Sequence, residues 1–554
     1  MKTTIQKIII TALKSARADG VLPSSDFPEV LIDTPKHESQ GDYSTNIAMM
    51  AAANQKMPPG KIAQAIVARI KDDDGIFSDV QIAGPGFINF SLNPAAWYPI
   101  LHRIHRQDRQ YGASGEGNGC RVQVEFVSSN PTGPLHVGHG RGAAIGDSLA
   151  NIMSFSGFDV QREYYINDSG RQIQTLGRSV FLRYLALHGR EAAFPDDCYQ
   201  GDYIATIAEA VKADKGESLL QVPEEDAIMY CARFATDQIL RGIRDDLKLF
   251  GVEFDRWYSE QSLYDDGKVD QILEDLRTKG LVYKKDDASW FRTTAYGDEK
   301  DRVVIRKNGQ TTYLASDIAY HHDKYLRGFD RVIDVWGADH HGYIPRMKAA
   351  VEATGQSPDQ LDVILVRLVN LLRGGEPVAM STRAGKFITL KDVIDEVGRD
   401  AARFIFLTRH HDSPLDFDLA LASKKTNENP VYYVQYVHAR IASILLKSRE
   451  RKIDLSSIDE IDLACLSAKE EVTLMKRMAA FPETILRSAE QMAPHHVAFY
   501  LMDLAGAFHT YYNKHRILTD STEKTRGRLY LVMAIQKVIR NGLTLLGVSA
   551  PERM

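Results

Sequence analysis

The sequence has few cysteines and no long apolar run. Its 554 residues include four cysteines, Cys120, Cys198, Cys231 and Cys465, which are too scattered to form a Cys-x-x-Cys metal pair. So small a number in so long a chain is typical of a reducing compartment, and we expect neither a disulfide nor zinc. No stretch of roughly 18 apolar residues occurs, and the N-terminus has no signal-peptide cleavage pattern, so we expect a cytoplasmic chain that spans no membrane.

The chain also lacks a net positive charge, because its formal net charge is -5. Any contact with RNA must therefore rest on local basic surfaces and not on overall attraction. The end of the chain is locally basic, with Lys514, Arg516, Lys524, Arg526, Arg528, Lys537, Arg540 and Arg553 against three acids. Taken alone, this pattern is more typical of a solvated helix surface. The length, with 44% hydrophobic and 25% charged residues, predicts a large enzyme of three or four domains.

A junction between a strand and a helix carries two histidines. The apolar run 121–127 predicts a strand, a turn-forming segment follows it, and residues 141–155 read as helix, with His136-Val137-Gly138-His139 between them. A helix N-terminus attracts anions and glycine permits close approach of a nucleotide, so the junction predicts a phosphate site. No Gly-Lys-Ser/Thr follows, which excludes a P-loop, and the glycines at 138, 140 and 142 do not have the spacing of a dinucleotide fingerprint.

His-x-Gly-His after a strand resembles the first signature of class I aminoacyl-tRNA synthetases and related nucleotidylyltransferases. The flanking residues 125–141, Glu-Phe-Val-Ser-Ser-Asn-Pro-Thr-Gly-Pro-Leu-His-Val-Gly-His-Gly-Arg, are similar to the version carried by arginyl-tRNA synthetases. The similarity continues along nearly the whole chain. Two surface histidines beside a helix cap would not explain those matches.

The chain divides into three predicted regions. Residues 1–110 indicate a compact α+β unit, with two strands around the Gly-Pro-Gly turn at 84–86. By composition this unit could be any interaction module; by resemblance it is the additional N-terminal domain that touches the tRNA elbow. A glycine-rich linker at 111–119 follows and opens the catalytic region, 111–395.

The catalytic region alternates strands and helices. Strand-like segments at 121–127, 160–166, 303–305, 332–335 and 363–366 favour an α/β fold with a doubly wound, Rossmann-like parallel sheet. Residues 170–257 indicate a helical insertion in it. From 396 to 554 the pattern predicts an all-α bundle, and the helix start at Asn429-Pro430 resembles that of the family's anticodon-binding domain.

A second signature loop is expected near residue 380. Class I synthetases carry Lys-Met-Ser-Lys-Ser there, and its cations neutralise the triphosphate; the corresponding stretch here is Ala379-Met380-Ser381-Thr382-Arg383-Ala384-Gly385-Lys386. Ala379 and Thr382 replace the two lysines. The resemblance assigns the positive charge of the loop to Arg383 and Lys386, and nucleotide binding to Met380 and Ser381. An arginine is not equivalent to a lysine here, because its guanidinium is a rigid planar group, whereas the lysine ammonium is a point charge on a flexible chain.

A guanidinium substrate requires an anionic pocket, because a carboxylate can accept two parallel hydrogen bonds from it. Tyr313 and Asp317 are four apart and so share one helical face. By resemblance, Asp317 binds the guanidinium and Tyr313 packs beside it. Glu125, Ser128 and Asn130, from the first signature, bind the polar groups of the same arginine.

Trp336-Gly337-Ala338-Asp339-His340-His341 follows a predicted strand at the edge where ligands bind in open α/β sheets. Gly337 permits close approach of the ribose, and Asp339 can accept hydrogen bonds from its hydroxyls. Either His340 or His341 reaches the amino acid, and we assign His341. Metal binding by this pair lacks an evident third ligand.

The resemblance implies ATP-dependent formation of arginyl-adenylate with release of pyrophosphate, then transfer of arginine to the terminal ribose of its tRNA. His136 and His139 would donate hydrogen bonds to phosphate, and Gly138 would lie under the adenine. Arg383 and Lys386 would hold the pyrophosphate. Mg²⁺ is expected with the ATP, and a monomer is expected, although the sequence does not determine the oligomeric state.

Three rival interpretations remain. A class I synthetase of another specificity, such as the cysteinyl enzyme, shares the signatures but has a zinc-type cysteine set. A non-catalytic RNA-binding paralogue could retain the fold, and the missing loop lysines keep this reading open. A small-metabolite adenylyltransferase would not need the region beyond Asp400, so deleting that region would leave it active.

Overall fold

A computed structural model describes residues 1–35, 37–190, 192–378, 388–454 and 461–554. The chain forms two compact units. One contains residues 1–108, 444–479 and 510–535, and the other contains residues 109–443, 480–509 and 536–554. The strand-to-helix junction belongs to the second unit, together with every other predicted site residue that the structure describes.

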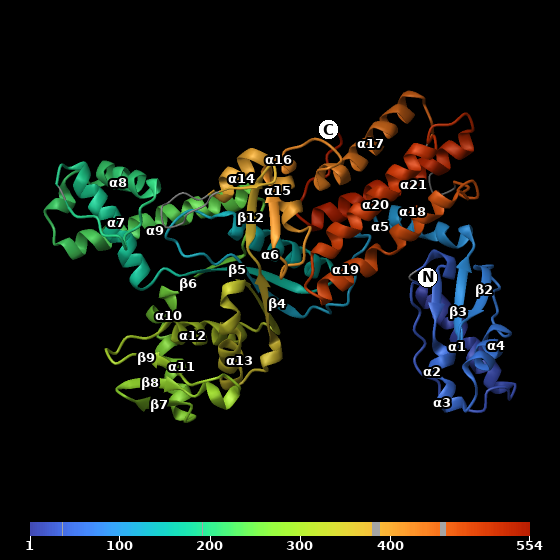
Figure 1. The fold of residues 1–554 in the computed structure, drawn as a ribbon, viewed down its shortest axis with the longest axis horizontal. Coiled ribbons are helices and arrows are strands. Elements are labelled where there is room, and N and C mark those ends of the chain that lie inside the picture. The colour runs from blue at the N-terminus through green and yellow to red at the C-terminus, as the bar shows by residue number, and fades with distance from the viewer. Residues whose placement is uncertain (36, 191, 379–387, 455–460) are drawn as a thin grey trace. The chain divides into compact units, whose positions relative to one another are not determined.

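The first unit begins with a three-stranded antiparallel sheet and its helices (Figure 1). The two predicted strands beside the Gly-Pro-Gly turn are confirmed as β2 (Phe77–Ala83) and β3 (Phe87–Leu92), and β1 (Tyr43–Thr45) pairs with the other edge of β3. The predicted N-terminal helix is α1 (Lys2–Ala18), whose buried stripe includes Ile5 and Ile9. Its other complete helices are α2 (Ile47–Met50), α3 (Ala52–Gln55), α4 (Pro59–Val67), α5 (Tyr98–Gln107) and α18 (Lys469–Ala479).

The centre of the second unit is a five-stranded parallel sheet with strand order β11-β10-β4-β5-β6. Its strands are β4 (Arg121–Glu125), β5 (Asp159–Ile166), β6 (Arg256–Ser259), β10 (Arg331–Gly337) and β11 (Leu361–Val366). The predicted doubly wound parallel sheet is therefore confirmed. The expectation for residues 303–305 was wrong in one respect, because β9 (Arg302–Ile305) pairs antiparallel with β8 in a separate sheet.

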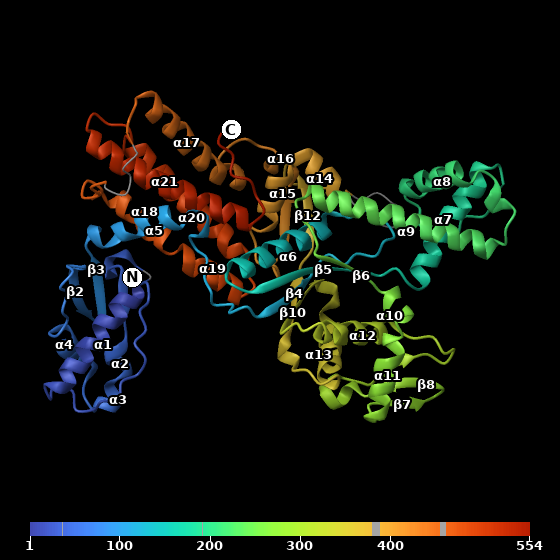
Figure 2. The same cartoon turned by 180° about the vertical axis from the view of Figure 1, so that it is seen from behind.

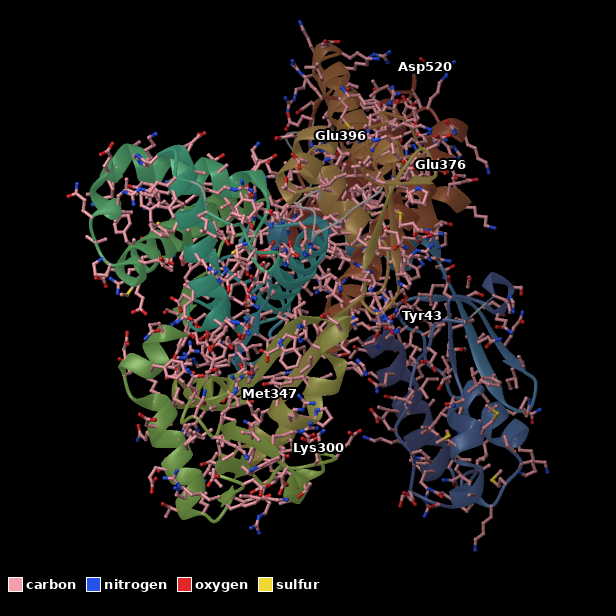
Figure 3. The ribbon with its side chains drawn as sticks, turned by 60° about the vertical axis from the view of Figure 1, so that its left-hand side comes forward. Tyr43, Lys300, Met347, Glu376, Glu396 and Asp520 are labelled. Carbon is pink, nitrogen blue, oxygen red and sulfur yellow. The ribbon has the colours of Figure 1, made fainter. Side chains whose placement is uncertain are left out.

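Helices cover both faces of the parallel sheet. Helix α6 (Val137–Phe155) packs on β4, β5 and β10, while α12 (Tyr313–Leu326) and α13 (Ile344–Ala353) lie on the opposite side, as the two views in Figures 1 and 2 show. A Cβ atom at Gly146 would lie 2.2 Å from the Phe126 ring, so this glycine permits α6 to approach the sheet closely. The opposite layer is a continuous apolar core that includes the fully buried Met347, labelled in Figure 3.

The helical insertion consists of α7 (Arg171–Leu187), α8 (Asp202–Lys215) and α9 (Glu224–Leu249), which pack on one another. Sequence reading missed β6, which directly follows the insertion and has only four residues. Between β6 and α12 the chain forms α10 (Gln261–Asp265), α11 (Lys268–Thr278) and an antiparallel sheet of β7 (Val282–Lys285), β8 (Ala288–Phe291) and β9.

After β11 the second unit continues with a small three-stranded sheet and then with helices. These elements are β12 (Val369–Arg373), β13 (Glu376–Pro377), α14 (Leu390–Val397), α15 (Arg399–Phe406), β14 (Leu415–Asp418), α16 (Leu419–Ala422) and α19 (Phe481–Glu490). Three long helices contribute residues to both units: α17 (Pro430–Glu450), α20 (His495–Lys514) and α21 (Thr522–Leu545). Residues 396–554 are thus mainly helical, as predicted, but the expectation of an all-α region was wrong at β14, which pairs with β12 in a sheet.

Candidate functional site

The two signature histidines cap helix α6. The backbone N–H of Gly138 donates to Nδ1 of His136 at 3.1 Å, and the backbone N–H of His136 donates to Nδ1 of His139 at 3.2 Å. The two rings stack with their centroids 3.7 Å apart. This capping box satisfies donors that a helix N-terminus otherwise leaves free, and it fixes both rings in one orientation.

Both imidazoles are neutral at physiological pH. Burial lowers the pKa of His136, and burial together with the neighbouring His136 lowers the pKa of His139 to about 3. Because each Nδ1 accepts a hydrogen bond, the hydrogen-bond network assigns the proton of each neutral ring to Nε2. Each ring therefore offers one N–H donor and no charge.

The turn between β4 and α6 is strained at its start. Val127 and Ser128 have φ of 69° and 39°, which is unfavourable for residues that are not glycine and costs about 1–3 kcal/mol each. Surrounding groups hold the conformation: the Ser128 hydroxyl donates to Glu125 at 2.9 Å, and the Tyr164 hydroxyl donates to the Ser129 carbonyl at 2.9 Å. Asn130 follows this held segment, two residues after Ser128.

Asp317 and Tyr313 lie on one helix, as predicted. The Tyr343 hydroxyl donates to the Asp317 carboxylate at 2.5 Å, while Tyr313 is half exposed. The pKa of Asp317 is raised to about 6, mainly by burial and also by the negative charges of Glu260 and Glu125, although the Tyr343 hydrogen bond opposes the rise. A partly buried acid with such repulsive neighbours favours a cationic ligand.

Glu260 is a further acid that sequence reading missed. It is 2% exposed and accepts hydrogen bonds from the Ser169 hydroxyl at 2.8 Å and the Ser316 hydroxyl at 2.7 Å. With Asp317 and Glu125 it also raises the pKa of Tyr165, after burial as the main cause. The negative charges of Glu260, Asp317 and Glu125 therefore influence the same groups around Tyr165. The position of Glu260 directly after β6 was the available signal, but that strand was not predicted.

Glu125 belongs to a buried ion network beneath this region. The Lys324 ammonium is fully buried and donates to Glu125 at 2.6 Å and to Asp334 at 2.8 Å. Asp334 also accepts from His321 at 2.8 Å. Lysine and histidine hold the pKa of Asp334 at about 2, against the effect of its burial. The network fixes the Glu125 side chain at the carboxyl end of β4.

The predicted ribose site follows β10, at the same sheet edge as the end of β4. Gly337 ends the strand, and Asp339, His340 and His341 lie on an exposed 3₁₀ turn, residues 338–343. The Asp339 side chain is 82% exposed, and the His340 ring packs edge-on against Trp336. These polar groups are therefore open to a ligand. His341 is also exposed.

The predicted second signature loop lies outside the described residues. This applies to Met380, Ser381, Arg383 and Lys386 and to the two lysine replacements, Ala379 and Thr382. The loop is followed directly by described residues that contact the first signature: the backbone N–H of Leu390 donates to the Leu135 carbonyl at 2.8 Å.

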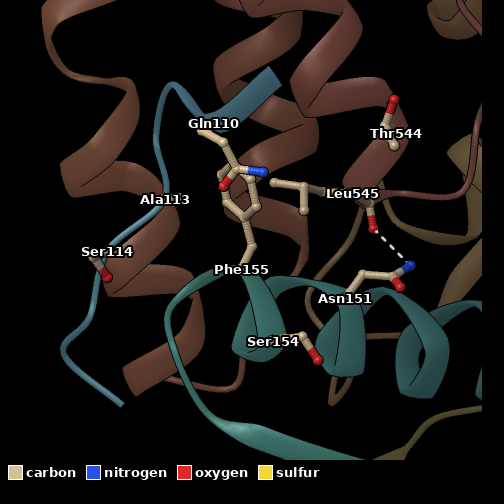
Figure 4. Close-up of a pocket in the computed structure, with 8 residues that line it drawn as sticks. All are labelled: Gln110, Ala113, Ser114, Asn151, Ser154, Phe155, Thr544 and Leu545. Carbon is tan, nitrogen blue, oxygen red and sulfur yellow. Dashed lines mark hydrogen bonds between the residues drawn. The ribbon is translucent and has the colours of Figure 1, made fainter. Parts of the chain in front are cut away.

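A separate cavity of about 420 Å³ lies between the chain at 110–114, the end of α6 and residues 544–545 (Figure 4). Asn151 donates to the Leu545 carbonyl at 3.2 Å across it. Its lining is neutral and includes none of the predicted site residues. Within the described ranges, no cluster of three or more His, Cys, Asp or Glu side chains could hold a metal ion, and no helix has the length and apolarity to cross a membrane.

Comparisons with known proteins agree with this geometry. Residues 101–416 match the family described as tRNA synthetases class I (R), catalytic domain. Residues 3–92 match the arginyl tRNA synthetase N terminal domain, and residues 434–554 match the DALR anticodon binding domain. The fold and the site therefore define a class I aminoacyl-tRNA synthetase.

Relatives that match over their full length indicate which family of class I synthetases the chain belongs to. A protein from Desulfosudis oleivorans named arginine–tRNA ligase is 57% identical over the whole of both chains, and one of the same name from Syntrophotalea carbinolica is 53% identical over the whole of both chains. A putative arginyl-tRNA synthetase from Campylobacter jejuni, a solved structure, is 35% identical with a TM-score of 0.77, over 84% of this chain and 100% of its own. The chain belongs to the arginyl-tRNA synthetase family.

The fold also matches that of arginyl-tRNA synthetase from Thermus thermophilus, with a TM-score of 0.75 over the whole of both chains at 23% identity.

Proposed function

We propose that this chain ligates L-arginine to its tRNA in two steps. In the first, a carboxylate oxygen of arginine attacks the α-phosphorus of ATP, an O–P bond forms, and pyrophosphate leaves with the electron pair of the broken bond. In the second, the terminal ribose hydroxyl of the tRNA attacks the carbonyl carbon of the mixed anhydride, loses its proton and expels AMP. Neither step needs a protein nucleophile, so positioning and charge stabilisation supply the catalysis.

Each predicted residue has a role in this proposal. The Nε2–H groups of His136 and His139 donate to the phosphate oxygens on which charge develops, and Gly138 lies under the adenine. Gly337 and Asp339 bind the ribose. Arg383 and Lys386 hold the pyrophosphate, with Met380 and Ser381 beside the nucleotide. Mg²⁺ arrives with the triphosphate and offsets its charge.

The arginine occupies the region around Asp317. Its guanidinium lies against Asp317, with Glu260 as a further anion, and packs beside Tyr313. Glu125, Ser128, Asn130 and His341 bind its remaining polar groups. The surroundings of Asp317 carry this assignment: it lies beside Tyr343 and on the helix whose Ser316 donates to Glu260, and burial, with the charges of Glu260 and Glu125, makes its own charge unfavourable without a cation.

We further propose that residues 1–110 contact the tRNA, that residues 111–395 catalyse, and that residues 396–554 bind the anticodon. We also propose that the enzyme is a monomer and that it is cytoplasmic.

The decisive experiment is a charging assay with total tRNA and each of the twenty amino acids in turn. Arginine alone should be attached. Attachment of a different amino acid would establish another specificity, and tRNA binding without any charging would establish a non-catalytic paralogue.

A further inference from the structure

The helical insertion reaches back to the turn that carries Asn130. The Tyr203 hydroxyl, near the start of α8, donates to the Thr132 carbonyl at 2.7 Å. Gln172, in the first turn of α7, accepts a hydrogen bond from the Asn130 amide at 2.8 Å. Two separate helices of the insertion thus hold the same turn, on either side of Pro131.

The local sequence allows Tyr203 to reach this carbonyl. A Cβ atom at Gly201 would lie 2.4 Å from the Tyr203 ring, and a Cβ atom at Gly133 would lie 3.2 Å from its hydroxyl. Glycine at both positions leaves room for the ring and for its approach to the turn. Burial raises the pKa of Tyr203, so its hydroxyl remains protonated and donates.

The C-terminal end of the turn, at Leu135 and His136, is held by a different segment of the chain. The backbone N–H of Leu390 donates to the Leu135 carbonyl at 2.8 Å, and His136 forms a β-bridge with Thr389. Helix α6 begins at the next residue. The histidines are therefore fixed without the insertion, whereas Asn130 and Thr132 contact it directly.

We propose that Tyr203 and Gln172 are positioning residues that fix Asn130 for the amino-acid substrate while leaving the nucleotide site unaffected. Gln172 accepts from the amide nitrogen of Asn130, which leaves the amide oxygen free to accept from the α-ammonium group. The hydrogen bond from Tyr203 restrains the Thr132 carbonyl and so the turn that carries Asn130. The inference rests on the proposed function, because it assumes that Asn130 binds arginine.

The test compares two tyrosine variants of the full chain. Tyr203→Phe removes only the hydroxyl that reaches Thr132. Tyr184→Phe is the matched control, because the buried Tyr184 hydroxyl donates to the Gly216 carbonyl at 2.6 Å within the insertion itself. Pyrophosphate exchange with tRNA present gives KM for arginine and KM for ATP separately, and thermal melting shows whether each variant is folded.

Tyr203→Phe should raise KM for arginine about three- to tenfold, the effect of one net hydrogen bond, with KM for ATP within about twofold of the wild type. Tyr184→Phe should leave both constants unchanged. Gln172→Leu should raise KM for arginine in the same way. Equal KM values for arginine in Tyr203→Phe and Tyr184→Phe would overturn the inference, and so would a parallel rise in both constants.

Measurements on the wild type distinguish failure of this inference from failure of the proposed function. Exchange by the wild type that depends on arginine supports the function whatever Tyr203→Phe does. A wild type with no exchange for any amino acid would overturn the proposed function and this inference with it.

Discussion

Replacing Asp317 by asparagine should destroy arginine activation and stabilise the folded protein at the same time. The substitution keeps the size of the side chain and removes its charge. That charge is unfavourable in the protein itself, because burial, Glu260 and Glu125 raise the pKa of Asp317 to about 6. In the proposed function the same charge pairs with the guanidinium of the substrate.

The stability change follows from the pKa. A rise from the ordinary value of 3.8 to about 6 corresponds to about 3 kcal/mol, at 1.36 kcal/mol per unit. For an acid whose folded pKa is raised, stability is fully present below the unfolded pKa and is lost as the pH rises through the folded pKa. Asp317→Asn should therefore have a higher Tm than the wild type at pH 7.5, and the difference should vanish near pH 4.

The activity change has the opposite sign. Removing one partner of a buried ion pair costs about 3–5 kcal/mol, which is roughly a hundred- to several-thousandfold in kcat/KM for arginine. The pH profile gives a second measurement: in the wild type, KM for arginine should rise as the pH falls below about 6, because Asp317 then takes up a proton. Pyrophosphate exchange at a series of pH values measures both.

Asp323→Asn on the same helix is the control. Asp323 pairs with Lys268 at 3.1 Å and with Arg327 at 3.1 Å, so its loss should lower the Tm and leave arginine activation intact. If Asp317→Asn melted below the wild type at pH 7.5, or charged tRNA at the wild-type rate, the assignment of Asp317 would be refuted.

Three further predictions concern the neighbouring groups. His139→Asn should lower the rate of pyrophosphate exchange, measured with arginine and tRNA, about a hundred- to thousandfold, and near-normal rates would refute its role. Because the pKa of His139 is about 3, kcat should show no ionisation of this ring between pH 6 and 8, and an inflection that His139→Asn removes would contradict its neutrality. Lys324→Met should destabilise the fold by about 3–5 kcal/mol, seen as a lower Tm, since Glu125 and Asp334 lose their shared cation.

Local sequence was sufficient for the parts of the site that are continuous in the chain. The strand, the turn and the helix around His136 follow one another directly, and Tyr313 and Asp317 need only helical spacing to share a face. The parallel sheet was also predictable, because the hydrophobic segments that form β4, β5, β10 and β11 are long enough to be recognised as strands in the sequence.

Contacts between distant segments were not predictable in this way. Glu260 follows a strand of only four residues, which is too short to show an alternation of apolar and polar residues. Its charge influences the pKa of Asp317 only because α12 packs beside β6. Residues 303–305 have the composition of a strand, but composition does not say which sheet a strand joins. Tyr203 is 71 residues from the carbonyl it holds, so no local pattern could have linked the two.

The repulsion among Asp317, Glu260 and Glu125 explains how a pocket could select a guanidinium. Burial and like charge disfavour the ionised state of Asp317, and a bound cationic side chain would relieve that penalty. A neutral side chain of the same shape would bring no cation to the Asp317 carboxylate. The ammonium of lysine offers three donors at one point, whereas the guanidinium of arginine offers five in a planar fork. Discrimination then comes from the cost of binding the wrong ligand, and that cost is large because the acids are buried. The charge that is unfavourable in the protein alone is therefore, in the proposed site, the charge that would exclude the competitors of arginine.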